Sequence, residues 1–191
     1  MTSDVLWRRM RYFLSPQWDL YQAIAPKLAG QSVLEIGCGT GFGAVQFMRY
    51  AQSVHATDID PDAIAFCQQA WPINGLAFAE YDICTTYDSP PDLAQYDAVV
   101  MIEVLEHVSN RGRALTAAWH HLLPGGTLYV TARNAAADLR RNDLHNEELT
   151  AAEFLLELGH IYGSVNLYDY SLANRLTDTS HATPTIAVCK K

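Results

Sequence analysis

Residues 32–43 read SVLEIGCGTGFG, in which an apolar strand pattern leads directly into a turn that contains four glycines. We predict a strand over 32–36, a turn over 37–43 and a helix over 44–50. Glycine in such a turn lets the backbone approach a ligand without interference from a Cβ atom. The N–H groups at the start of the following helix are donors for an anionic or carboxylate group. This strand–turn–helix unit predicts a cofactor site in an α/β fold.

Strands and helices alternate along the chain after this unit. Further strands are predicted at 53–57, 76–80, 98–102, 127–131, 160–167 and 185–188. Helices are predicted at 15–24, 61–70, 113–123 and 150–158. The run AVVMI at 98–102 is apolar throughout, as in a strand buried on both faces. The pattern predicts an α/β fold with one doubly wound, mostly parallel sheet of about seven strands and helices on both faces.

The length of 191 residues and the hydrophobic content of 49% suit one globular domain. We predict that residues 1–29 form an N-terminal helical cap segment and that residues 30–191 form the cofactor-binding domain. The segment before residue 30, the loop at 133–147 and the stretch at 168–184 are predicted to contact the substrate. Five aromatic residues are candidates for a wall over the site, with packing on the sheet as the alternative. They are Trp7, Tyr12, Phe13, Trp18 and Tyr21.

The net charge of −8 argues against a nucleic-acid partner, because an acidic surface repels phosphate backbones. Cys38, Cys67, Cys84 and Cys189 are scattered, so neither a disulfide framework nor a zinc cluster is predicted. The sequence contains no apolar run of membrane-spanning length and no signal-peptide pattern. A cytoplasmic location is therefore the expectation.

Two carboxylates bear on the identity of the cofactor. Asp58 follows the second predicted strand, where an acidic residue can accept both hydroxyl hydrogens of a ribose. Residues 39–44 also fit the dinucleotide pattern G-x-G-x-x-A, which keeps a nicotinamide-dependent reductase as an alternative. However, Glu35 precedes the first glycine, and a carboxylate suits a cationic amino group better than a pyrophosphate. S-adenosylmethionine (SAM) carries an ammonium group, a ribose and an adenine.

Five segments carry a resemblance to a known family. They are VLEIGCGTG (33–41), ATDIDPDAI (56–64), AEYDI (79–83), YDAVVMIEVLEHV (96–108) and LLPGGTLYV (122–130). In this order and spacing the chain resembles the class I SAM-dependent methyltransferases over about residues 30–165. Within that family it is similar to the small-molecule, ubiquinone-biosynthesis O-methyltransferases. The resemblance implies a seven-stranded sheet whose last strand, at 185–188, is antiparallel.

The resemblance also implies a set of cofactor contacts. Glu35 would reach the amino-acid end of SAM, Asp58 the ribose hydroxyls and Asp82 the adenine amino group. Glu103 would lie beside the sulfonium. The remaining predicted contacts are Gly37, Cys38, Gly39, Thr40, Gly41, Ile59 and Ile83. The implied activity is methyl transfer to a small-molecule acceptor, with a hydroxyl as the predicted accepting group. A non-catalytic SAM-fold module that activates a partner subunit is a further alternative.

A second possible site follows the fourth predicted strand. On a helix, Glu103, Glu106 and His107 would share one face, and His145 lies in a later loop. These four residues could ligate magnesium, manganese or zinc, as in the small-RNA 3′-terminal ribose methyltransferases that the Glu-x-x-Glu-His pattern resembles. The simpler interpretation is that Leu-Glu-His-Val orients a local turn. If the nucleophile must lose a proton, His145 or His107 is the predicted base.

Overall fold

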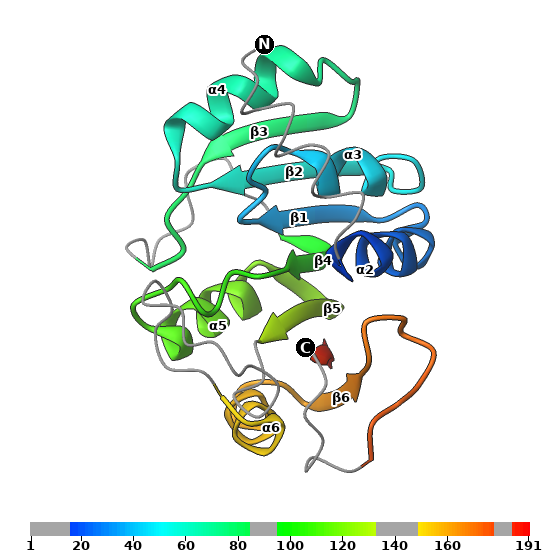
Figure 1. Ribbon diagram of the computed structural model, residues 1–191, viewed down its shortest axis with the longest axis vertical. Helices are drawn as coiled ribbons and strands as arrows, with labels where there is room; N and C mark the ends of the chain where they lie inside the picture. Colours follow the sequence, from blue (N-terminus) through cyan, green and yellow to red (C-terminus); the bar gives the residue numbers. More distant parts are fainter. Residues whose placement is uncertain (1–15, 85–94, 133–148, 178–184) are drawn as a thin grey trace.

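The computed structural model describes residues 16–84, 95–132, 149–177 and 185–191 (Figure 1). Its centre is one seven-stranded sheet in the order β3-β2-β1-β4-β5-β7-β6. The strands are β1 (Ser32–Ile36), β2 (Ser53–Asp58), β3 (Leu76–Glu80), β4 (Tyr96–Met101), β5 (Leu122–Ala132), β6 (Ser164–Tyr168) and β7 (Thr185–Lys190). Strands β1 to β5 pair in parallel, and β7 pairs antiparallel with both β5 and β6. This topology confirms the predicted fold, including its antiparallel last strand.

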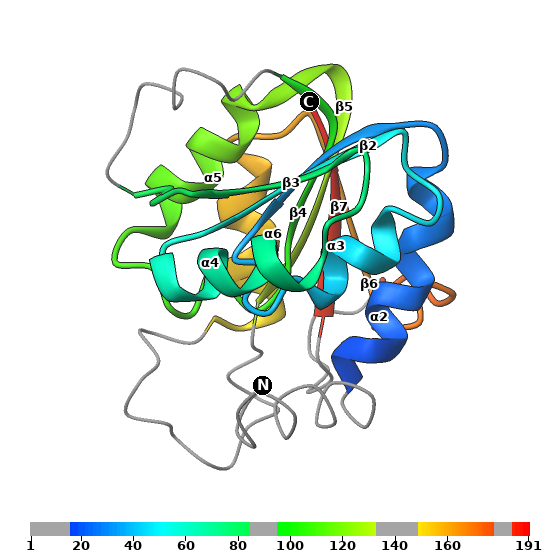
Figure 2. The same cartoon turned by 90° about the horizontal axis from the view of Figure 1, so that it is seen from above.

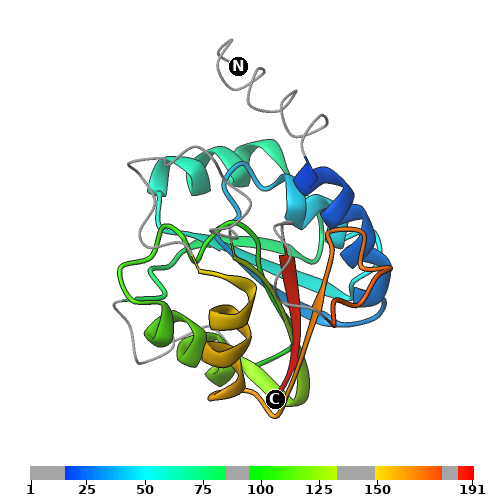
Figure 3. The same cartoon turned by 60° about the horizontal axis from the view of Figure 1, so that its bottom comes forward.

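Helices cover both faces of the sheet, as predicted. They are α2 (Pro16–Ile24), the 3₁₀ helix η1 (Ala25–Leu28), α3 (Phe42–Phe47), α4 (Pro61–Ala70), α5 (Arg111–His120) and α6 (Ala151–Gly159). Figures 2 and 3 show α2, α3 and α4 on one side of the sheet and α5 and α6 on the other. Each set of helices encloses its own apolar core.

The alternation of side chains along the central strands builds these two cores. In β1, Val33 joins the core under α2, α3 and α4, whereas Leu34 joins the core under α5 and α6. Successive side chains of a strand point to opposite faces, so a strand covered on both sides is apolar at nearly every position. Residues 98–101 of β4 meet this requirement, since all four side chains are fully buried.

The N-terminal helical segment is part of the core on its side of the sheet. Leu20, Ile24 and Leu28 are fully buried and pack with α3 and the sheet. Pro26 lies in η1, where the α-helix gives way to a tighter turn, since proline cannot continue the helical hydrogen bonds. The division of the chain at residue 30 stays a prediction.

Several element boundaries differ from the sequence-based expectation, most of all around β5 and β6. The helix predicted to run to residue 123 ends at His120, and Leu122 already pairs with Tyr96 as the start of β5. Pro124 therefore lies within an irregular strand and does not terminate the helix. The strand predicted at 160–167 begins only at Ser164, because residues 160–163 form the turn that follows α6.

α6 begins one residue after its predicted start, with Thr150 as the N-cap. Thr150 accepts a hydrogen bond from the Glu153 backbone, and the Glu153 side chain accepts one from the Thr150 N–H, which makes a full capping box. None of the helices in the described ranges has the length and apolar character needed to cross a membrane.

Candidate functional site

The glycine-rich turn follows β1 and needs glycine at three positions. Gly37, Gly39 and Gly41 have φ values of +76°, +52° and +73°, a region that L side chains rarely adopt. A Cβ atom on Gly37 would lie 2.5 Å from Val104 Cγ2, and one on Gly41 would lie 2.9 Å from Cys67 Sγ. At these two positions the space saved by glycine is filled by the protein's own side chains. The glycines therefore let the turn pack closely against its neighbours.

The end of helix α4 holds this turn through two hydrogen bonds. The Cys67 thiol donates to the Gly39 carbonyl over 3.3 Å, and the Trp71 indole N–H donates to the Thr40 carbonyl over 2.9 Å. The side chain of Cys38 is buried, so the cofactor contact predicted for Cys38 would be made largely by its backbone. Thr40 is half-buried, and its Oγ1 has no hydrogen-bond partner among the described residues. All four cysteines are free thiols.

Glu35 is a buried carboxyl group at the end of β1. It is only 2% exposed, and Oε2 has no hydrogen-bond partner among the described residues. Burial raises the pKa of Glu35 to about 8, with smaller contributions from Cys67 and Asp58, while hydrogen bonds from the Ala44 N–H and the Tyr21 hydroxyl act in the opposite direction. The group is thus held mainly protonated at neutral pH, and a cation placed beside it would favour its ionisation.

Asp58 ends β2 and faces the glycine turn. Its Oδ2 accepts the Gly39 N–H over 2.7 Å, and its Oδ1 accepts the Asp60 N–H over 3.0 Å. Each carboxylate oxygen has two lone pairs, so Asp58 can accept further hydrogen bonds from a ligand. The next residue, Ile59, is 62% exposed.

The segment after β3 lies beside Asp58. The Tyr81 N–H donates to the Asp58 carbonyl over 2.9 Å, which brings Asp82 to the same edge of the sheet. Asp82 Oδ1 accepts the Cys84 N–H over 2.8 Å. The side chain of Ile83 is buried in the core under α5 and α6, so the cofactor contact predicted for Ile83 would have to come from its backbone.

Glu103 occupies the turn directly after β4. Its φ is +56°, its N–H donates to Thr131 Oγ1 over 2.8 Å, and its Oε1 accepts the Tyr170 hydroxyl over 2.8 Å. Sequence reasoning marked residues 168–184 as a substrate-contact stretch but did not single out Tyr170. The contact spans 67 positions of sequence, and no local pattern reveals it.

The helical face predicted for the metal ligands is not formed. Residues 104–107 make one turn, closed by a 2.9 Å hydrogen bond from the His107 N–H to the Val104 carbonyl, and the left-handed backbone of Glu103 prevents a continuous helix. Glu106 is buried whereas His107 is exposed. Within the described part of the chain, no three His, Cys, Asp or Glu side chains are grouped to hold a metal ion. His145 lies outside the described residues.

His121 is the residue at the C-terminal cap of α5. It is 2% exposed, and its Nε2 lies 2.9 Å from the Tyr81 hydroxyl. Burial lowers the pKa of His121 to about 4, and the neighbouring His120 adds to this effect. The imidazole is therefore neutral at physiological pH, and it is a buried structural group that contacts Tyr81.

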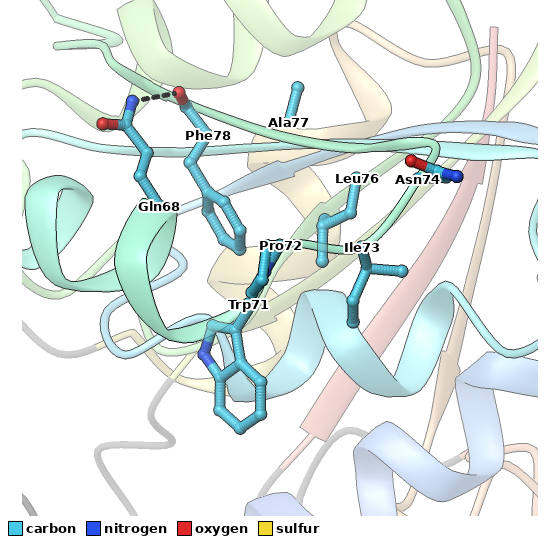
Figure 4. Close-up of a pocket in the computed structure, with 8 residues that line it drawn as sticks. All are labelled: Gln68, Trp71, Pro72, Ile73, Asn74, Leu76, Ala77 and Phe78. Carbon is cyan, nitrogen blue, oxygen red and sulfur yellow. Dashed lines mark hydrogen bonds between the residues drawn. The ribbon is translucent and has the colours of Figure 1, made fainter.

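A groove of about 390 Å³ runs between the end of α4 and β3 (Figure 4). Its wall includes Trp71, Ile73 and Phe78, and Gln68 donates to the Phe78 carbonyl over 3.1 Å. None of the sequence-predicted site residues lines it. The groove borders the amino end of β3, whereas the glycine turn, Asp58 and Glu103 lie at the carboxyl ends of β1, β2 and β4. In open α/β sheets, ligands bind at the carboxyl ends.

The arrangement at the carboxyl ends agrees with the comparisons with known proteins. The methyltransferase domain family matches residues 34–130, which include the glycine turn, Asp58 and Glu103. The chain belongs to this family.

Curated relatives give the same assignment, and solved structures share the fold. The chain is 32% identical over 142 residues to a probable S-adenosylmethionine-dependent methyltransferase of Mycolicibacterium smegmatis, covering 70% of this chain and 52% of that protein. It is 32% identical over 108 residues to a ubiquinone biosynthesis O-methyltransferase of Xylella fastidiosa, covering 56% and 44%. The chain thus spans about half the length of the curated relatives it matches. The fold is similar to that of the N-methyltransferase NodS from Bradyrhizobium japonicum, with a TM-score of 0.66, 20% identity, and coverage of 100% of this chain and 99% of that chain.

Proposed function

We propose that the chain binds SAM and transfers its methyl group to a hydroxyl group of a small molecule. The observation that carries the proposal is the buried Oε2 of Glu35, which has no hydrogen-bond partner among the described residues and lies beside the glycine turn of a methyltransferase domain. A buried oxygen without a hydrogen-bond partner is costly, and the ammonium group of SAM would supply both the proton donor and the compensating charge.

The neighbouring residues fit the rest of the cofactor. Asp58 retains acceptor capacity for ribose hydroxyls, and the exposed Ile59 offers an apolar surface for the adenine ring. Asp82, from the segment that Tyr81 ties to Asp58, would accept a hydrogen bond from the adenine amino group. The glycines at 37, 39 and 41 form the turn over which the amino-acid end would lie.

The chemistry divides between the cofactor and the chain. When bound, SAM supplies an electrophilic methyl group on a sulfonium. The residues of the chain hold the cofactor, orient the acceptor in line with the methyl group and exclude water. Glu103 marks the acceptor side, since it follows β4 at the same edge of the sheet. His107, exposed in the turn after Glu103, or His145 would take a proton from the acceptor if the nucleophile requires it.

Two observations favour a small hydroxyl-bearing acceptor. The chain is similar to a protein named as a ubiquinone biosynthesis O-methyltransferase. The net charge of −8 disfavours a polyanionic acceptor such as RNA. No observation favours an RNA 3′-terminal ribose methyltransferase. Glu103, Glu106 and His107, the metal ligands which that alternative requires, do not share a helical face. The divalent metal and the cytoplasmic location stay predictions from the sequence.

The test combines a binding measurement with a transfer measurement. Calorimetry with S-adenosylhomocysteine (SAH), and with NADH as the competing candidate, is followed by mass analysis of small phenols, catechols and amines incubated with methyl-labelled SAM. We expect SAH to bind, NADH not to bind, and label to appear on hydroxyl oxygen. Binding of NADH alone would favour the reductase. Binding of SAH without any transfer would favour a non-catalytic module, and transfer to nitrogen would overturn the hydroxyl assignment.

A further inference from the structure

Two strained residues lie on either side of one hydrogen bond at the acceptor side of the site. Among the described residues, Glu103 and Leu172 are the non-glycine residues with positive φ, each at +56°. Between them, the Tyr170 hydroxyl donates to Glu103 Oε1 over 2.8 Å. A left-handed backbone at such a residue costs on the order of 1 kcal/mol or more and persists only where the surroundings enforce it. Strained backbone at both Glu103 and Leu172 indicates that the surrounding structure holds the Tyr170–Glu103 hydrogen bond in place.

The loop that carries Tyr170 is closed by its own hydrogen bonds. The Asp169 carboxylate accepts the Ser171 N–H over 3.1 Å, the Ser171 hydroxyl over 2.5 Å and the Asn174 amide over 2.6 Å. The Leu172 N–H donates to the Asp169 carbonyl over 3.0 Å, and the side chains of Leu172 and Tyr170 both pack against the core under α2, α3 and α4. The loop therefore has one well-defined shape, and that shape presents Tyr170 to the end of β4.

Glu103 is held from the other side by β5. Its N–H donates to Thr131 Oγ1, and the Tyr170 hydroxyl also interacts with the Thr131 side chain. Burial raises the pKa of Tyr170, and the neighbouring Glu103 charge raises it further, so the hydroxyl stays protonated and acts as a donor. With Oε1 engaged by Tyr170, the orientation of the whole Glu103 carboxylate is fixed, because its two oxygens share one plane.

We propose that Tyr170 is a positioning residue that fixes the Glu103 carboxylate as a hydrogen-bond acceptor for the methyl-accepting molecule. The pair thereby selects acceptors that carry a hydroxyl or amino hydrogen. This inference rests on the proposed function only in assigning the Glu103 side of the site to the acceptor. A site built to accept a hydrogen bond rejects an analogue that lacks the hydrogen, because the partly buried carboxylate then loses water without gaining a partner.

The first test examines the contact without any ligand. In protein labelled with [13Cζ]tyrosine, the Tyr170 resonance is identified by its disappearance in Tyr170→Phe. We expect Glu103→Gln to move this resonance and to leave that of Tyr162 in place, because the Tyr162 hydroxyl donates to the distant Leu115 carbonyl. A Tyr170 resonance that is unchanged in Glu103→Gln would overturn the inference.

The second test measures selection with matched probe pairs on SAH-loaded protein. The pairs are phenol and anisole, catechol and 1,2-dimethoxybenzene, and aniline and N,N-dimethylaniline. We expect the member with the hydrogen to bind roughly 10-fold more tightly in the wild type, as a hydrogen bond to a charged group provides. This preference should largely disappear in Tyr170→Phe and in Glu103→Gln but survive in Tyr162→Phe, while Tyr170→Phe should leave SAH affinity unchanged.

The outcomes separate this inference from the proposed function. If SAH binds but no pair is discriminated, or if discrimination survives in Glu103→Gln, the selection role is wrong and SAM binding stands. If SAH does not bind the wild type, the proposed function fails, and the tyrosine resonance still decides whether Tyr170 holds Glu103. Unfolding curves for each variant show whether any loss reflects folding.

Discussion

The backbone N–H of Gly39 donates a 2.7 Å hydrogen bond to Oδ2 of Asp58. This bond links the glycine turn after β1 to the end of β2. The same carboxylate that we propose for the ribose thus also holds the turn over which the amino-acid end of SAM would lie. Cofactor binding and the shape of the turn should therefore respond together to changes at Asp58.

Replacement of Asp58 by alanine is expected to weaken SAH binding by about 1–3 kcal/mol, through the loss of charged hydrogen bonds. Titration calorimetry measures the change. Asp62→Ala is the matched control, because Asp62 is an exposed carboxylate in the nearby first turn of α4. Equal affinities in the wild type and Asp58→Ala would remove Asp58 from the cofactor site.

SAH binding is expected to release a proton from Glu35 near neutral pH. The pKa of Glu35 is raised to about 8 by burial, and the ammonium group of the ligand favours the ionised form. Affinity should therefore rise as the pH increases from about 6 toward 8, by up to roughly tenfold per unit. Calorimetry in two buffers with different ionisation enthalpies counts the protons released.

Glu35→Gln is the control for that linkage. The amide is close in size but cannot ionise, so this variant should bind SAH more weakly and show no proton release from this group. Proton release of the same size in wild type and Glu35→Gln would show that another residue supplies it.

Gly37→Ala is expected to destabilise the fold for two separable reasons. The positive φ costs about 1 kcal/mol for alanine, and the new Cβ would lie 2.5 Å from Val104 Cγ2, which adds roughly 1–3 kcal/mol of overpacking. Val104→Ala removes the clashing methyl group. The double variant should therefore lose at least about 1 kcal/mol less than the sum of the two single losses. Urea unfolding measures all four proteins, and strict additivity would contradict the contact.

Stability is expected to fall on acidification because of His121. The pKa of His121 is about 4 in the folded protein, below its usual 6.5, so the unfolded chain binds the proton first as the pH decreases. The contribution is complete above about pH 7 and should have lost about 1.4 kcal/mol by pH 5.5. Unfolding curves of His121→Gln should lack this loss, whereas those of the exposed neighbour variant His120→Gln should keep it.

The parts of the fold that the sequence predicts are those with a local cause. β1 and β4 are marked by apolar runs, the turn at 37–41 by its glycines, and α6 by the capping signal at Thr150. The apolar spacing around Leu122 fits both the end of a helix and the start of a strand. Leu122 is in a strand because it pairs with Tyr96, a partner that only the tertiary structure provides.

The positions of the candidate cofactor residues could also be predicted where they follow from the order of strands. Glu35 and Asp58 lie near the carboxyl ends of β1 and β2, and Asp82 follows β3, so a parallel sheet places all three at one edge. The shared helical face predicted for Glu103, Glu106 and His107 is absent, because three- and four-residue steps place side chains together only on a helix and Glu103 has a positive φ. The metal itself stays a prediction. Tyr170 and Glu103 are 67 positions apart in the sequence, so their hydrogen bond depends on tertiary structure that no local pattern predicts.

The place of β7 in the sheet has a consequence for the order in which the protein is assembled. In the described structure β6 forms its strand ladder with β7, which is made later, and β7 in turn joins β6 to β5. During translation β6 lacks its partner strand until the residues of β7 have been synthesised and have left the ribosome. Closure of the sheet is then a late, long-range event, and before it the nascent chain exposes strand edges that are prone to aggregation. Cellular yield should consequently depend on how quickly the last strand becomes available.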